Sequence, residues 1–159
     1  MKELSLLDME LAVAGYFNFR QNIIVPNVSW GFFIHECDLL IIRPSGFTIE
    51  VEIKRSIADV KADAKKRHGH VDHQNRIQKL YFAVPNYLYE DCKDLIPVYA
   101  GILAIEYVDN QYSACKVKRQ AVKKNCRKLS EKEMLAVARL GTMRIWTLKK
   151  IIKRGTKNV

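Results

Sequence analysis

Two short stretches with alternating polar and apolar residues, joined by a turn, constrain the fold more than any other feature. They cover residues 37–42 and 47–54, and the turn between them has the sequence Arg-Pro-Ser-Gly. Proline and glycine favour such a turn, so the segment is predicted to form a β-hairpin. If the loop consists of residues 44–46, the numbers of opposed residues sum to 90. A loop of two or four residues would break both faces, so the alternation supports this register.

This register gives the hairpin one apolar face and one acidic face. The apolar face consists of three opposed pairs, Cys37 with Ile53, Leu39 with Val51, and Ile41 with Ile49. On the other face Asp38 lies opposite Glu52, and Glu36 lies opposite Lys54. Opposed carboxylates repel because their Cβ atoms are only ~5 Å apart, and a cation between them relieves that repulsion. A hard ion such as Mg²⁺ suits oxygen ligands, whereas the alternative is a solvated strand face with ordinary ion pairs.

The rest of the sequence predicts helices and further strands around this hairpin. The pattern indicates a helix over 6–17, a strand over 22–28, a polar helix ending near 67, a helical piece over 72–80, strands over 81–84 and 98–105, and a helix from about 130 to 153. Capping-box signatures start three of the helices, at Ser5/Asp8, Ser56/Asp59 and Ser130/Glu133. We expect Gly141 to divide the last helix, and Glu10 to face inward from the first.

The length and order of these elements predict a single domain. A chain of 159 residues forms one compact unit, here spanning residues 1–159. The predicted order is α-β-β-β-α-β-β-α, which is typical of an α/β (α+β) fold with a mixed central sheet flanked by helices. Seven apolar residues of the last helix are expected to cover the sheet: Leu135, Val137, Leu140, Met143, Ile145, Trp146 and Ile151.

Charge is distributed unevenly along the chain. Residues 1–113 hold 12 Lys/Arg and 15 Asp/Glu, a net charge of −3, whereas residues 114–159 have a net charge of +13. A basic end of this kind suits a polyanion, because each neutralised phosphate releases counterions. The candidate contacts to a DNA backbone are Lys116, Lys118, Arg119, Lys123, Lys124, Arg127 and Lys128, with a second group at Lys61, Lys65, Lys66 and Arg67. A solvated basic tail and a solvated helix face are the alternatives.

Several classes of protein are excluded by composition. The longest apolar runs, such as residues 39–42, are far shorter than the ~20 residues that a membrane helix needs. The N-terminus has no apolar stretch of a signal peptide, so we expect a cytoplasmic protein that does not associate with membranes. The four cysteines show no CxxC spacing, which argues against a zinc module or a disulfide framework.

The hairpin resembles a nuclease signature. Asp38 followed by Glu52-Ile53-Lys54 is similar to the Asp…(Asp/Glu)-x-Lys motif of the PD-(D/E)xK superfamily, although Cys37 stands where that motif has proline. Within the superfamily, this run together with Tyr81-Phe82-Ala83-Val84-Pro85 most resembles the MmcB-like DNA repair proteins. The resemblance covers roughly residues 5–106. It implies a restriction-endonuclease-like core, α-β-β-β-α-β, with added basic C-terminal helices over about 114–159.

The resemblance also implies a site and a cofactor. Asp38 and Glu52 would bind Mg²⁺ or Mn²⁺, with the Ile53 backbone carbonyl as a further ligand. Lys54 would position or deprotonate the attacking water and stabilise charge on the phosphate, and Glu10 would be an auxiliary ligand. Such an ion polarises a phosphoryl oxygen and lowers the pKa of bound water. A neighbouring lysine stabilises the charge that develops in the transition state.

Three other groups of residues have more than one interpretation. The sequence from His68 to His73 matches the HxHxDH motif of metallo-β-lactamase-like hydrolases, but no histidine follows His73, so a surface cluster or a phosphate contact is the preferred reading. Trp30, Phe32 and Phe33 are candidates to stack on bases, although aromatic runs are more often buried in a core. Gln78 and Tyr81 resemble the Gln…Tyr pair of some nuclease branches.

These observations lead to one expected function and two alternatives. We expect a Mg²⁺- or Mn²⁺-dependent deoxyribonuclease that acts in DNA repair or in a mobile element. The first alternative is a non-catalytic DNA-binding module that retains the nuclease fold, although the intact Asp38, Glu52 and Lys54 argue against it. The second is a nuclease for structured substrates such as branched DNA, which a homodimer would favour.

Overall fold

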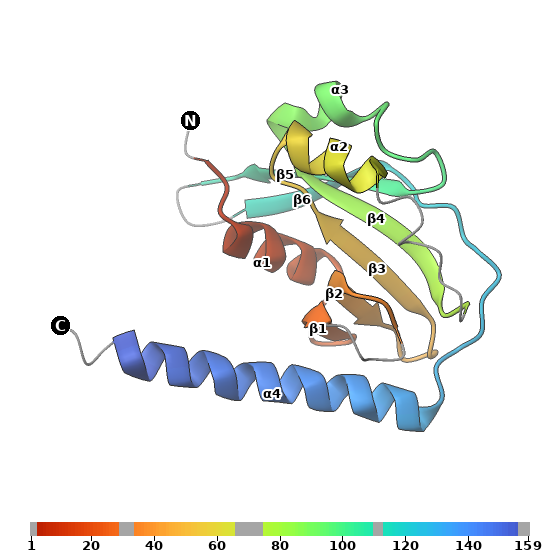
Figure 1. The fold of residues 1–159 in the computed structure, drawn as a ribbon, viewed down its shortest axis with the longest axis vertical. Coiled ribbons are helices and arrows are strands. Elements are labelled where there is room, and N and C mark those ends of the chain that lie inside the picture. Colours follow the sequence, from red (N-terminus) through yellow and green to blue (C-terminus); the bar gives the residue numbers. More distant parts are fainter. Residues whose placement is uncertain (1–2, 29–33, 66–74, 110–112, 156–159) are drawn as a thin grey trace.

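The protein is built around one six-stranded sheet whose strands lie in chain order (Figure 1). The computed structural model describes residues 3–28, 34–65, 75–109 and 113–155. The strands are β1 (Ile23–Val28), β2 (Cys37–Ile42), β3 (Thr48–Ile53), β4 (Ile77–Pro85), β5 (Gly101–Tyr107) and β6 (Ser113–Arg119). The helices are α1 (Leu6–Tyr16), α2 (Ile57–Lys65), α3 (Tyr89–Cys92) and α4 (Glu131–Gly155), with a 3-10 turn η1 (Asn86–Leu88). The expected mixed α+β class is confirmed.

The sheet contains both strand directions. Strands β1, β2 and β3 are antiparallel neighbours, whereas β3, β4 and β5 run parallel and β6 returns antiparallel to β5. Parallel neighbours need a crossover connection. Helix α2 lies in the connection from β3 to β4, and η1 and α3 lie in the connection from β4 to β5.

The predicted hairpin register is confirmed from the pair Leu39/Val51 to the pair Ile42/Thr48. Leu39 pairs with Val51 and Ile41 pairs with Ile49 across β2 and β3. The loop needs Gly46, because its φ is +85° and an added Cβ would lie 3.2 Å from the Leu129 carbonyl oxygen. Left-handed φ values of this kind favour glycine.

One pairing of the predicted apolar face is wrong. The paired positions of β2 and β3 begin at Leu39 and Val51, so Cys37 is not paired with Ile53. The predicted pair of Asp38 with Glu52 also lies beyond these paired positions. Cys37 instead packs with Leu40 and Ile42, on the opposite side of the sheet from Leu39. The strict alternation therefore fails at the first residue of β2, next to Asp38.

Apolar residues cover the two faces of the sheet differently. One face forms a single cluster, in which Met9 and Val13 of α1 pack against residues such as Leu39 and Val51. The other face has two clusters. The cluster near α4 includes Val25, Leu40, Ile42, Leu129 and Val137. The cluster near α2 and α3 includes Val60, Leu80, Phe82, Cys92 and Ile102.

A buried polar strip separates these two clusters. It consists of Thr48, Glu50 and Glu52, which follow one another along the same face of β3. Glu50 lies between Leu40 on β2 and Leu80 on β4, one from each cluster. Burying carboxylates costs free energy unless they are paired, and such groups cluster at functional sites. The strip therefore indicates the face of the sheet that carries the candidate site.

Two elements differ from the sequence prediction. Residues 77–80 belong to β4 and not to the predicted helical piece, because this stretch is buried beside β3; residues 72–74 lie outside the described residues. Residues 113–119, which include the first basic residues of the C-terminal region, form the edge strand β6 and not a helix, and Lys116 and Lys118 are exposed on it.

Helix α4 is continuous through Gly141 instead of divided there. A Cβ at Gly141 would lie 3.1 Å from the Val25 side chain, so glycine allows the helix to approach β1 closely. The second half of α4 extends beyond the sheet (Figure 1). Val137 and Leu140 therefore pack as predicted, but the other five apolar residues expected on the sheet are more than half exposed: Leu135, Met143, Ile145, Trp146 and Ile151.

Candidate active site

The acidic residues of the hairpin converge where β2 begins and β3 ends. Asp38 Oδ2 accepts a hydrogen bond of 2.7 Å from the Ile53 backbone N–H, beyond the last paired residues of the two strands. On the other side of β3, the Lys54 backbone N–H donates to the Ala83 carbonyl at 2.9 Å. The chain on either side of the Ile53–Lys54 peptide bond is therefore held by both neighbouring strands, and Asp38 is held directly against it.

Lys54 is enclosed between two carboxylates. Its Nζ lies 2.8 Å from Glu52 Oε2 and 2.9 Å from Asp63 Oδ1 of α2, with only 11% of the side chain exposed. The Phe82 ring centroid lies 5.9 Å from the same nitrogen. Glu36, which the register places opposite Lys54, is exposed. The cross-strand pair expected for an ordinary polar face is thus replaced by a buried cluster.

The electrostatics of this cluster restrict what Lys54 can do. Burial alone would lower the pKa of Lys54, but its ion pairs with Glu52 and Asp63 outweigh burial and raise that pKa well above its usual range. A lysine with a raised pKa keeps its proton at neutral pH. Of the two roles expected for Lys54, proton abstraction from water is therefore disfavoured, and stabilisation of negative charge is favoured.

Glu52 has the opposite perturbation. Burial first, and then the negative charges of Asp38 and Glu50, raise the pKa of Glu52 to about 7, although Lys54 opposes this shift. The carboxylate is therefore poised to lose its proton near neutral pH. A cation bound beside Glu52 and Asp38 would relieve the same repulsion that raises this pKa.

Helix α1 brings a third carboxylate toward Asp38. Glu10 is half-buried on α1, and its pKa is raised first by burial and second by the negative charge of Asp38. Because the shift includes this electrostatic contribution, Glu10 and Asp38 lie close enough to sense each other. The inward position expected for Glu10 agrees with its partial burial.

The donor set fits a hard divalent cation better than zinc. In the part of the chain that the structure describes, no three histidine, cysteine, aspartate or glutamate side chains are grouped to hold a metal by themselves. Mg²⁺ needs no such cage, because it keeps several waters and binds through one or two carboxylates. Asp38 and Glu52 supply two carboxylates, and neighbouring negative charge raises the pKa of Glu52.

Sequence reasoning missed two polar partners. Asp63 is a buried acid three residues after the buried Val60 on α2. The spacing places both residues on one face of the predicted helix, and this was the signal that could have identified Asp63. Glu50 is buried, and His35 Nε2 lies 2.9 Å from its Oε2. Its place on the same face as Glu52 was visible in the alternation, but its partner was not.

Arg127 and Arg119 have structural roles. Arg127 contacts Glu133 at 2.6 and 2.9 Å, and Arg76 contacts the same carboxylate at 2.8 Å. These hydrogen bonds hold the pKa of Glu133 well below its usual range, and the hydrogen bond from Arg127 has the largest effect. The Arg119 guanidinium donates to backbone carbonyls, including those of Ile96 and Pro97. Arg119 is thus directed at the protein backbone, whereas the DNA contact predicted for Arg127, which is exposed, stays a prediction.

The other residues predicted to contact DNA or to bind a phosphate or base differ in whether the structure describes them. Lys61, Lys123, Lys124 and Lys128 are exposed as a DNA contact requires. Lys65 is the last residue of α2. Other predicted residues lie outside the described part of the chain: Lys66, Arg67, His68, His70, Asp72, His73, Trp30, Phe32 and Phe33.

Gln78 and Tyr81 are both on β4 and not on a helix. The Tyr81 hydroxyl donates to Gln120 Oε1 at 2.8 Å, and its ring packs in the cluster under α1. Gln78 lies at a register shift between β3 and β4, where it lines a pocket with Lys123. The two side chains thus have separate surroundings.

Comparison with known proteins identifies the fold alone. No model of a known family matches the sequence, and a search of curated proteins gave no match. A solved structure of a protein of unknown function from Silicibacter pomeroyi is similar, with a TM-score of 0.62 and 19% sequence identity. The similarity covers 96% of this chain and 94% of that protein. It shows that nearly the whole chain shares one known architecture.

Proposed function

We propose that the protein is a cytoplasmic, Mg²⁺- or Mn²⁺-dependent deoxyribonuclease of the PD-(D/E)xK type with a restriction-endonuclease-like core. The observation that carries the proposal is the convergence of Asp38, Glu52 and Lys54 around one peptide segment at the end of β3. Two carboxylates that can hold a metal ion, and a protonated amine beside them, are the groups that phosphodiester hydrolysis needs. Action in DNA repair or in a mobile element is part of the same proposal.

Each residue of the site has a distinct task in this proposal. Asp38, Glu52 and the Ile53 carbonyl would hold the metal, which when bound polarises a phosphoryl oxygen and lowers the pKa of a bound water. Lys54 keeps its proton and offers positive charge to the phosphate. Asp63 fixes the position of the Lys54 ammonium group through its ion pair. Glu10 would accept a hydrogen bond from water beside Asp38.

DNA is the partner that the charge distribution supports. Residues 1–113 have a net charge of −3 and residues 114–159 a net charge of +13. The exposed lysines of segment 120–130 and Lys61 of α2 would contact phosphates, which position a duplex or strand without reading its sequence. Within the described residues, no helix has the length and apolar character needed to cross a bilayer.

A non-catalytic DNA-binding module is the second candidate. The observation that favours it is the ion-pair cluster itself, because Lys54 is already held by Glu52 and Asp63 without any ligand. A buried cluster of this kind can serve specificity of folding alone. Binding of DNA without cleavage would decide for this candidate.

A homodimer belongs to the proposal as well, and would suit a structured substrate such as branched DNA. The apolar stripe of α4 that buries Val137 continues at Ile145, Leu148 and Ile152, where it is 55–57% exposed. These residues lie on the same side of α4 as Val137, so the stripe continues the helix face that packs on the sheet. A second copy offers an acidic body to the basic α4, so charge complementarity favours it as the occupant.

The test compares DNA cleavage by matched pairs of variants. Plasmid and single-stranded DNA are incubated with Mg²⁺, Mn²⁺ or EDTA. Asp38→Asn and Lys54→Ala should each lower metal-dependent cleavage by about 100-fold or more. The surface pair Glu90 and Lys93 provides controls, since Glu90→Gln and Lys93→Ala alter a similar but exposed ion pair and should leave cleavage unchanged. Cleavage that survives both site substitutions would remove this assignment.

A further inference from the structure

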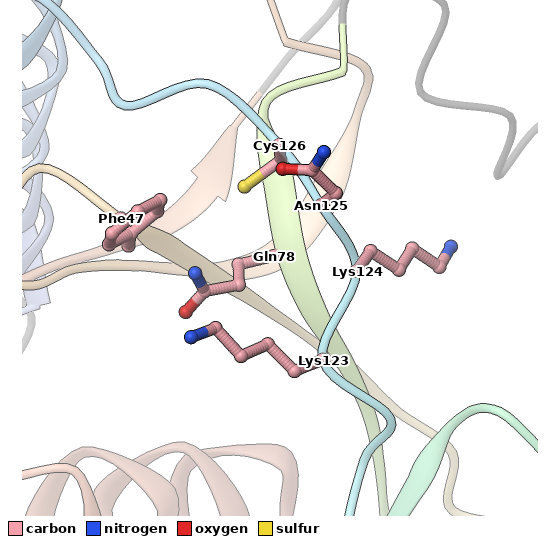
Figure 2. A pocket seen from close by; sticks show the side chains of 6 residues that line it. All are labelled: Phe47, Gln78, Lys123, Lys124, Asn125 and Cys126. Atoms are coloured by element: carbon pink, nitrogen blue, oxygen red, sulfur yellow. The ribbon is translucent and has the colours of Figure 1, made fainter.

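A pocket lies at the opposite end of β3 from the candidate active site. It has a volume of about 320 Å³ and is lined by Phe47, Gln78 and residues 123–126 (Figure 2). Phe47 and Glu52 are five positions apart in the sequence, which corresponds to about 17 Å along an extended strand. The pocket is therefore distinct from the cluster around Lys54, yet within reach of one extended ligand.

The pocket arises from an interruption of the sheet. Thr48 pairs with Ile77, but Ile49 pairs with Lys79, so Gln78 is an extra residue on β4. Such bulges change the direction of a side chain. Beside Gln78, β4 has segment 120–130 as its neighbour, because the Lys124 N–H donates to the Gln78 carbonyl at 2.9 Å.

Gln78 places a side-chain amide in this pocket. The residue is only 3% exposed, and its side chain points between Phe47 and Lys123 (Figure 2). Its amide lines the pocket, where a glutamine amide offers two donors and an acceptor. An amide in this position can hydrogen-bond to a polar group that enters the cavity.

Lys123 adds an available positive charge. Among the described residues, no acidic side chain forms an ion pair with it, and it points to the same side as Gln78 (Figure 2). Lys124 points to the other side of the segment, where its Nζ lies 4.7 Å from the centroid of the Tyr99 ring. Adjacent lysines thus have different surroundings, and one of them faces the pocket.

We propose that this pocket binds one nucleotide of a single-stranded DNA segment. The Gln78 amide would hydrogen-bond to the edge of the base, with adenine favoured because a glutamine amide matches its donor and acceptor. The Phe47 ring would supply an aromatic wall for the base, and Lys123 would contact the phosphate. The pocket volume lies at the lower end of the range for small-molecule sites, which suits a single nucleotide.

Binding is measured on the full chain in EDTA, so that cleavage does not intervene. Fluorescence anisotropy compares single strands of oligo-dA and oligo-dT. Lys123→Ala should lower the affinity for both strands roughly tenfold, whereas the control Lys93→Ala, at a surface lysine outside the predicted DNA contacts, should change it by less than about twofold. Gln78→Leu should remove the preference for oligo-dA, a loss of roughly tenfold for that strand alone. Because Lys123 is exposed, its variant tests the site even if Gln78→Leu fails to fold.

Competitors distinguish a DNA strand from other sources of the same chemistry. Unlabelled oligo-dA should displace the probe at much lower nucleotide concentration than free dAMP or inorganic phosphate. Displacement by dAMP at equal concentration would overturn the DNA strand as the ligand. Equal losses in Lys123→Ala and Lys93→Ala, with the base preference of Gln78→Leu intact, would overturn the pocket itself. Since the readout is binding without metal, these outcomes are independent of whether the chain hydrolyses DNA.

Discussion

Lys54 shows most clearly how one side chain connects the fold to the proposed chemistry. Its amine lies between Glu52 and Asp63, and these carboxylates raise its pKa while burial and neighbouring acids raise that of Glu52. The proximity of Asp38 to this segment followed from the hairpin register, since alternation with a period of two determines which side chains share a face. Asp63 could not be placed in this way. Its contact depends on how α2 packs against the sheet, which no local pattern specifies.

The raised pKa of Glu52 predicts a pH-dependent gain in stability when its charge is removed. A carboxyl whose folded pKa of about 7 exceeds its unfolded value of 4.5 stabilises the fold below pH 4.5 and loses that contribution as the pH rises through 7. In metal-free buffer, Glu52→Gln should therefore raise the unfolding free energy by about 1–3 kcal/mol at pH 8 and by less at pH 5.

Thermal unfolding at both pH values checks this prediction, with Lys54 still held by Asp63 in the variant. Glu90→Gln is the control, because Glu90 is exposed and should show no such pH-dependent gain. A lower melting temperature for Glu52→Gln at pH 8 than for the unmodified chain would mean that the Lys54 ion pair outweighs the cost of burying the charge.

Among the elements, helix starts were predictable and helix extents were not. The capping boxes at Ser5, Ser56 and Ser130 all form, because each depends on residues within three positions of one another. Strand β6 and the strand assignment of residues 77–80 depend on neighbours distant in sequence. The sequence predicts a helix break at Gly141, but α4 continues through it. The absence of a side chain at Gly141 allows close contact with Val25, which depends on tertiary structure.

Two glycines of helices should respond oppositely to alanine. A Cβ at Gly15 would meet nothing within 4 Å, so Gly15→Ala should stabilise the protein by about 0.5–1 kcal/mol through helix propensity. A Cβ at Gly141 would lie 3.1 Å from the buried Val25, which has little room to move. Gly141→Ala should therefore lose about 1 kcal/mol despite its better propensity. Denaturant unfolding measures both, and a gain at Gly141 would contradict the close helix–strand contact.

For the molecule as a whole, charge was predictable but its use was not. The basic C-terminal region is apparent from composition, and its exposed lysines agree with a polyanion partner. However, Arg119 donates hydrogen bonds to backbone carbonyls and Arg127 donates to Glu133, so both guanidinium groups hold the fold. The exposed half of α4 was not foreseen either. Amphipathic spacing indicates which face is apolar, but not where the sheet beneath it ends.

The exposed stripe of α4 predicts a change in oligomeric state when it is made polar. Leu148→Glu places a charge in the centre of the stripe and should convert a homodimer into a monomer, with the fold unchanged because Leu148 is 56% exposed. Light scattering coupled to size-exclusion chromatography measures the mass. Lys150→Glu, a charge change on the basic side of α4, is the control. A monomeric mass for the unmodified chain would contradict the proposed dimer.

Divalent-metal binding tests the central claim most directly, since the proposed chemistry requires Asp38 and Glu52 to share one cation. Calorimetric titration with Mn²⁺ at pH 8 should give one saturable site in the unmodified chain and in Glu90→Gln. The same titration of Asp38→Asn or Glu52→Gln should show affinity reduced by at least about tenfold. Equal Mn²⁺ binding by all four proteins, or no saturable binding by the unmodified chain, would contradict the account.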